Sequence, residues 1–112
     1  MKKIEAIIKP FTLDAVRIAL EKAGISGLTT SEVKGLARQK GRAEPSKGSD
    51  YSIEFKPKLK LEIIVRDEQA DAVVSAILRK SRIGGAGDGD ICVMSVEDVI
   101  RIRTDERGDA AI

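Results

Sequence analysis

Five short segments of the chain have the residue pattern of β-strands. The clearest is 59–65, where leucine and isoleucine alternate with lysine and glutamate, so that apolar side chains share one face. Segments 3–9, 29–35 and 91–95 are rich in β-branched and apolar residues, and 99–103 alternates isoleucine with arginine. We therefore expect a strand at each of these five positions.

Two other segments repeat apolar residues every three or four positions, which is the period of a helix. The first follows Thr12, which can cap its first turn, and ends at Gly24. The second follows Asp67 in the same way, and basic residues within 79–82 lie where the helix dipole favours cations. Both segments are predicted to be amphipathic helices that pack on a sheet.

The first four strands and the two helices alternate in the order βαββαβ. This order is typical of the ferredoxin-like α+β fold, in which helices cover one face of an antiparallel sheet. A chain of 112 residues holds one such domain, here 1–112. The fold serves many functions, so the function has to come from the site.

The periodicity stops between Ala37 and Lys58, where glycine, proline and serine are mixed with lysine and arginine. A loop of roughly 18–20 residues is unusual in so small a domain. Loops of this length are generally either functional or disordered. The stretch is therefore a candidate interaction segment.

Composition excludes several classes of function. There are 20 basic and 18 acidic residues, and only 3% of residues are aromatic, which argues against a nucleic-acid partner. Cys92 is the only cysteine and histidine is absent, so one chain cannot build a disulfide framework or a zinc site. No nucleophile–base pair is visible, and we do not expect an enzyme. Without a signal peptide or a membrane-length apolar stretch, the expected location is the cytoplasm, with no membrane insertion.

Two features suit the binding of phosphate. Gly84–Asp90 contains four glycines, so its backbone N–H groups can approach an anion closely, although a flexible connection explains the segment equally well. Arg101 and Arg103 are two residues apart on the predicted strand and therefore share a face, where two guanidinium groups suit phosphate oxygens. Ion pairs with Asp105 and Glu106 would explain this arginine pair equally well.

Seven short motifs follow one another along the chain, at 1–11, 32–35, 38–41, 47–51, 87–89, 101–104 and 109–112. Several motifs in order and at the right spacing are more specific than any one of them. On these motifs the chain resembles the PII nitrogen-regulatory family along essentially its whole length.

The resemblance implies a homotrimer with a nucleotide in each cleft between neighbouring subunits. It also identifies the long loop, about 37–55, as the T-loop between strands 2 and 3. Such proteins carry no tightly bound cofactor: ATP, ADP or AMP would act as an effector, and the T-loop would control a transporter or a metabolic enzyme. The resemblance thus implies a signal-transduction regulator.

The resemblance assigns nucleotide binding to ten positions of this chain. They are Thr29, Gly35, Arg38, Glu62, Ile64, Gly87, Asp88, Gly89, Arg101 and Arg103. The glycine loop and the arginines would meet the phosphates, while Thr29, Glu62 and Ile64 would surround the base and ribose.

Further positions concern a second ligand and modification. By the same resemblance, Gln39 would contact a magnesium ion that also holds 2-oxoglutarate, and Lys58 would pair with that ligand's carboxylate. Ser49 and Tyr51 match residues that are phosphorylated or uridylylated in some members.

One departure bears on the nucleotide. Asp90 stands where the family usually has a lysine that faces the phosphates. Exchanging attraction for repulsion costs on the order of 1–3 kcal/mol, or about tenfold in affinity or more. Ala37 likewise replaces a glycine close to the ligand. Asp88 and Asp90 suggest an alternative, a PII-like module that senses another small anion or a metal.

Overall fold

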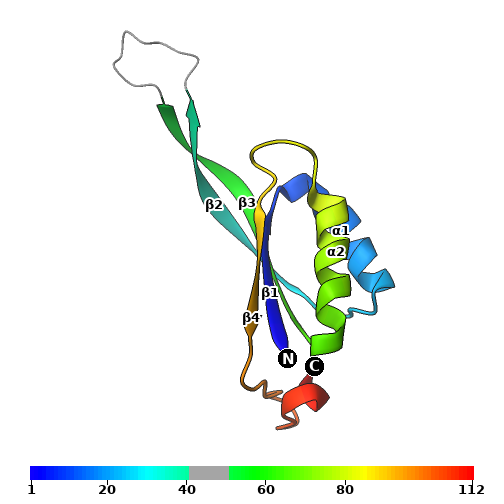
Figure 1. The fold of residues 1–112 in the computed structure, drawn as a ribbon. Helices are drawn as coiled ribbons and strands as arrows, with labels where there is room; N and C mark the ends of the chain where they lie inside the picture. The colour runs from blue at the N-terminus through cyan, green and yellow to red at the C-terminus, as the bar shows by residue number, and fades with distance from the viewer. Residues whose placement is uncertain (41–50) are drawn as a thin grey trace.

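The computed structural model describes the backbone of residues 1–40 and 51–112, and the side chains of 1–36 and 55–112. Two helices lie on one side of a four-stranded sheet (Figure 1). The elements are β1 (Lys2–Ile8), α1 (Leu13–Lys22), β2 (Thr29–Lys40), β3 (Tyr51–Val65), α2 (Ala70–Ser81) and β4 (Asp90–Ser95), with 3-10 turns at Pro10–Thr12, Asp67–Gln69 and Gly108–Ala111.

The sheet has the order β2-β3-β1-β4, and every neighbouring pair is antiparallel. Strand β1 lies inside the sheet, where Glu5 is opposite Glu62 of β3 on one side and Cys92 of β4 on the other. The predicted ferredoxin-like α+β fold is confirmed.

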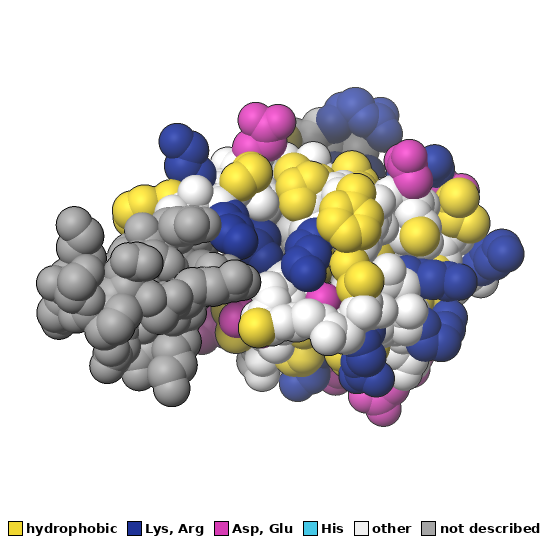
Figure 2. All heavy atoms as spheres, turned by 90° about the horizontal axis from the view of Figure 1, so that it is seen from above, with side chains coloured by type: hydrophobic (Ala, Val, Ile, Leu, Met, Phe, Trp, Pro, Cys, Tyr) yellow, Lys and Arg dark blue, Asp and Glu magenta, His cyan; other side chains and the backbone are white. Residues whose placement is uncertain are grey.

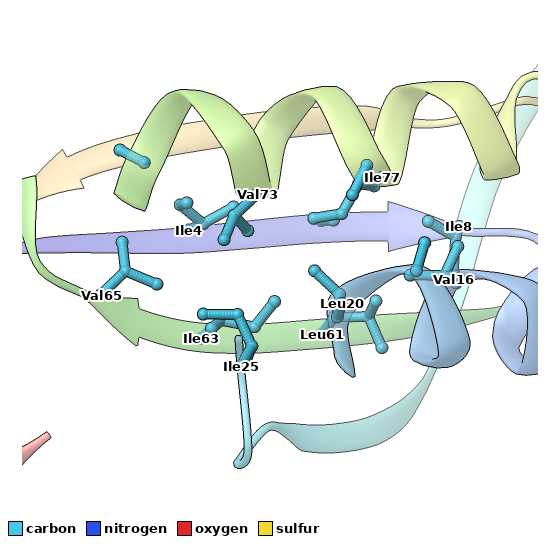
Figure 3. Packing of buried hydrophobic residues seen from close by; sticks show 14 residues of the cluster. Ile4, Ile8, Val16, Leu20, Ile25, Leu61, Ile63, Val65, Val73 and Ile77 are labelled. Atoms are coloured by element: carbon cyan, nitrogen blue, oxygen red, sulfur yellow. The ribbon is translucent and has the colours of Figure 1, made fainter. Parts of the chain in front are cut away.

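The hydrophobic core fills the space between the sheet and the helices (Figure 3). Alternate residues of β1 and β3 face this space, and the helices supply the opposite wall. Full burial of one such aliphatic side chain contributes roughly 1.5–3 kcal/mol. The side chains with 0 or 1% exposure include Ile4, Ile8, Val16, Leu20, Leu61, Ile63, Val65, Val73 and Ile77.

The other face of the sheet carries charged residues in alternating sign. Lys3 lies 2.7 Å from Glu62 and 3.7 Å from Glu5, and Lys60 lies 3.9 Å from Glu5. This arrangement confirms the alternation predicted for 59–65. Both helices lie on the opposite face, so this charged face is not covered by them.

The predicted irregular stretch from Ala37 to Lys58 is wrong at both of its flanks. Strands β2 and β3 continue as a paired ribbon, with Ala37 opposite Glu54 and Lys40 opposite Tyr51. Polar residues can continue an antiparallel ladder, because the ladder is closed by backbone hydrogen bonds and needs no buried face. The rest of the predicted loop, 41–50, lies outside the described residues.

The predicted strand at 99–103 is also wrong. The chain turns back on itself: the amide of Arg101 donates to the carbonyl of Glu106 (2.9 Å), and that of Asp105 donates to the carbonyl of Arg101 (2.8 Å). Asp105 has a φ of 64°, a left-handed conformation that aspartate tolerates better than most residues. The alternation of isoleucine and arginine at 99–103 therefore does not mark a strand of the sheet.

Neither predicted helix cap forms as expected. The hydroxyl of Thr12 donates to the carbonyl of Lys9 (2.7 Å) and bonds the preceding turn. Asp67 lies 2.8 Å from the N-terminal amine, so its carboxylate ties the start of β1 to the turn before α2.

Candidate functional site

A cavity of about 640 Å³ lies at the end of β3 near the C-terminus. Thr29 at the start of β2 and Glu62 and Ile64 of β3 line it together, as does Arg101 from the C-terminal turn. Thr29 is opposite Glu62 in the sheet register, which brings these two positions side by side. Four of the ten predicted nucleotide positions therefore meet in one cleft.

Charges in this cleft are held by neighbouring groups. The ammonium of Lys3 bonds the Glu62 carboxylate and thereby lowers the pKa of Glu62 below its ordinary value. The guanidinium of Arg101 donates to the Ala111 carbonyl (3.1 Å) and lies 3.6 Å from the Glu106 carboxylate. These contacts with the C-terminal segment therefore orient the Arg101 side chain in the cleft.

Arg103 does not join Arg101 in the cleft. It lies in the turn that replaces the predicted strand, and its exposed side chain is not part of the cavity lining. The strand that would have placed the two arginines on one face does not form. The pairing of Arg101 with Glu106 agrees with the ion-pair interpretation.

The glycine loop at 84–90 is closed by one of its own side chains. Oδ2 of Asp88 accepts hydrogen bonds from the amides of Ile83 (3.0 Å) and Gly84 (2.9 Å). Its other oxygen, Oδ1, lies 3.4 Å from the ammonium of Lys9. The Asp88 carboxylate thus occupies two of the amides that could have bound an external anion.

A second lysine holds the same loop. The ammonium of Lys58, on β3, donates to the carbonyl of Gly87. This contact brings Lys58, predicted to bind a carboxylate ligand, directly against the loop predicted to bind phosphates. Lys9 was not predicted from the sequence, because a lysine at the end of a strand gives no local signal of a distant partner.

Gly89 is required by its surroundings. Its φ is +106°, and a Cβ at this position would lie 1.8 Å from the carbonyl oxygen of Ile7. The close approach lets Asp90 begin β4 opposite Ile7. From the sequence, this glycine was predicted to let an anion approach the backbone closely. The structure requires glycine here because the Ile7 carbonyl leaves no space for a Cβ.

Asp90 lies at the same end of the molecule as the loop. With Asp88, Gly89 and Arg82, it lines a cavity of about 410 Å³ between α2 and β4. Its side chain is exposed, so its negative charge stands beside the predicted phosphate loop.

The two halves of the predicted site are separated within one protomer. Ile64 is opposite Lys3 on β1, whereas Asp90, directly after the glycine loop, is opposite Ile7. Four residues of a strand span roughly 14 Å. The cleft and the glycine loop accordingly line different cavities.

The remaining predicted positions are only partly described. Gly35 lies in β2 against the side chain of Lys58, where a Cβ would come within 3.3 Å of the lysine's Cγ. Arg38, Gln39 and Tyr51 belong to the paired ribbon, but their side chains are outside the description, and Ser49 lies wholly outside it.

Two further properties concern metals and membranes. Within the described residues, no three side chains of the histidine, cysteine, aspartate or glutamate type gather as a metal site. In the same part of the chain, none of the helices is long and apolar enough to cross a membrane.

The Asp88 carboxylate predicts a pH dependence of stability. Hydrogen bonds from the amides of Gly84 and Ile83, and from Lys9, lower the pKa of Asp88 below its ordinary value. A group with a depressed folded-state pKa stabilises the protein above its unfolded-state pKa of about 3.9, and this contribution is lost as pH falls further. Asp88→Asn should therefore unfold at lower urea than wild type at pH 7.

The urea midpoints of wild type and Asp88→Asn should converge as pH falls below about 4 and through the folded-state pKa of Asp88. Urea midpoints measured at a series of pH values test this. A gap between the two midpoints that stays constant down to the acid limit would contradict the assignment.

Comparison with known proteins agrees with the fold. Residues 1–106 match the sequence model of the family "Nitrogen regulatory protein P-II". Relatives named nitrogen regulatory protein P-II from Microchaete diplosiphon and P-II 1 from Escherichia coli K12 are each 54% identical over the whole of both chains. The solved structure of B. subtilis GlnK is 32% identical, with a TM-score of 0.84 over 99% of this chain and 97% of that one. The chain therefore belongs to the P-II family of nitrogen regulatory proteins, a family of signal-transduction regulators.

Proposed function

We propose that the protein is a homotrimeric regulator that binds an adenine nucleotide between neighbouring protomers and signals through its β2–β3 ribbon. The observation that carries this proposal is the separation of the two half-sites. A cleft with Thr29, Glu62, Ile64 and Arg101 lies at one end of the sheet, and the glycine loop lies at the other. In the proposed trimer, the glycine loop of one protomer completes the cleft of another.

The two half-sites differ in chemistry as such a ligand requires. The cleft offers apolar surface from Ile64 and Leu28 beside the Glu62 carboxylate and the Thr29 hydroxyl, which suits a base and a ribose. The glycine loop offers backbone amides other than those of Ile83 and Gly84, which Asp88 occupies. The ammonium groups of Lys9 and Lys58 lie beside these amides, which suits phosphates. Arg101 adds a guanidinium group, the side chain that matches phosphate geometry best.

The uncovered face of the sheet supports an assembly. Only the opposite face is covered by helices, and this one presents Ile7, Ile64 and the exposed Cys92 and Met94 among its ion pairs. A sheet face with apolar residues is stabilised when another surface covers it. Three copies packed on this face would also bring one protomer's glycine loop towards another's cleft.

The β2–β3 ribbon is the proposed signalling element. Leu36 is opposite Phe55, and both side chains are strongly exposed, at 61% and 67%. An exposed apolar pair on a two-stranded ribbon is a suitable contact for a partner protein, such as a transporter or an enzyme. Figure 2, seen from the end that carries the glycine loop, shows Lys and Arg side chains interspersed with exposed hydrophobic ones.

The co-ligands remain part of the proposal. Lys58, now bonded to the Gly87 carbonyl, could exchange this contact for a carboxylate of 2-oxoglutarate. A magnesium ion would have to take its ligands largely from the nucleotide phosphates and from Gln39, because no acidic cluster is found in the described residues. This fits magnesium, which usually binds with few protein ligands.

Calorimetry with ATP, ADP and AMP, with and without magnesium and 2-oxoglutarate, tests the proposal, together with light scattering for the trimer. Arg101→Ala should weaken nucleotide binding about tenfold or more, because a charge-assisted contact is lost. Arg17→Ala on α1 removes a guanidinium group that pairs with Glu21; it is the matched control and should leave affinity unchanged.

A monomeric protein that binds nucleotide, or one that binds none at millimolar levels, would contradict the proposal. Thermal-shift measurements with bicarbonate and divalent metals examine the alternative effectors in the same preparation, since a ligand of the native state raises the unfolding midpoint.

A further inference from the structure

The helical layer has a groove of its own, on the side of the sheet away from the charged face. Helices α1 and α2 pack against each other, and α2 ends where α1 begins (Figure 1). A cavity of about 340 Å³ between them is lined by Ala15, Ile18, Ala19, Lys22, Arg79 and Lys80. The alanines leave space above the helix backbones, and Ile18, 45% exposed, is an apolar wall.

The rim of this groove is cationic and uncompensated. Lys22, Arg79 and Lys80 are exposed, and within the described residues none of them forms an ion pair or a side-chain hydrogen bond. Arg17, one turn before the end of α1, is by contrast held 2.8 Å from Glu21. Helix dipoles favour cations in the last turns. They do not explain why cations from two helices flank one apolar groove without counter-ions.

We propose that this groove docks an acidic, amphipathic segment of a partner protein. Carboxylates of the segment would meet the three cations, and an aliphatic side chain would enter the groove against Ile18 and the alanines. Opposite charge around a small apolar centre is the arrangement that gives specific protein contacts their orientation.

Two other occupants fit less well. A helix that binds a bilayer presents several bulky apolar residues, whereas Ile18 is the only large one among the residues that line this groove. A free phosphate would use the cations but leave Ile18 without a role. The groove is formed by the helices alone, so this docking does not depend on the nucleotide site.

The test uses the full chain and a fluorescein-labelled helical peptide of about four turns that carries glutamates on one face and leucines on the other. We expect saturable binding by fluorescence anisotropy that weakens as salt is raised. Lys80→Glu and Arg79→Glu should each weaken it about tenfold or more, because each reverses a contact charge. Ile18→Ser should weaken it too, without a change in salt dependence.

The matched control is Lys34→Glu, the same charge reversal at an exposed lysine on β2, which should change affinity by less than about twofold. Circular dichroism confirms that each variant is folded. Equal weakening by Lys34→Glu, or no effect of Ile18→Ser, would reduce the binding to general electrostatics and overturn the proposal. So would tighter binding to phosphatidylglycerol vesicles than to the peptide.

Discussion

Gly89→Ala adds one methyl group and should lower the free energy of unfolding by about 3 kcal/mol or more. The added Cβ would lie 1.8 Å from the carbonyl oxygen of Ile7, and the backbone φ of +106° is itself unfavourable for alanine. Relief of the overlap has to break the start of the β1–β4 pairing, because the atom it meets is backbone. Urea denaturation at fixed protein concentration measures the effect.

Gly84→Ala is the matched control. This glycine lies in the same loop with a φ of +97°, but a Cβ there has no atom within 4 Å. Gly84→Ala should lower the free energy of unfolding by only about 1–2 kcal/mol, the cost of holding alanine in a left-handed backbone conformation. If both variants lose the same stability, the contact with Ile7 is not what requires glycine at position 89.

Asp90→Lys should raise affinity for ATP about tenfold or more. The substitution replaces a carboxylate beside the proposed phosphate loop with an ammonium group, which exchanges repulsion of the phosphates for attraction. Position 90 is exposed at the start of β4, so the longer side chain has room. Calorimetric titration of wild type and variant with ATP gives the comparison.

Asp90→Asn separates the two parts of this effect, since it removes repulsion without adding attraction. Its affinity should lie between those of the other two proteins, and the gain should be smaller for AMP, which carries less charge. Unchanged ATP affinity in Asp90→Lys would mean that position 90 does not face the phosphates in the assembled protein. The trimer itself could still form, and light scattering would report that independently.

Much of the fold could be predicted because its periodicities are local. The alternation at 59–65 reports which side chains face the core, since a strand turns its side chains to opposite faces at every residue. The helices at α1 and α2 were visible for the same reason, through a period near 3.6. The same rule failed at 99–103, where isoleucine and arginine alternate in a turn that has no neighbouring strand.

The sequence alone also determined the family, since its motifs span the chain in order, and it pointed to the glycine loop as the place for phosphates. Only the tertiary structure decided that Asp88 closes this loop, that Lys9 and Lys58 hold it, and that Arg103 does not line the cleft with Arg101. The steric need for glycine at position 89 arises from Ile7, on another strand. Contacts between residues so distant in the chain depend on sheet register and packing. These cannot be predicted from the local periodicity of the sequence.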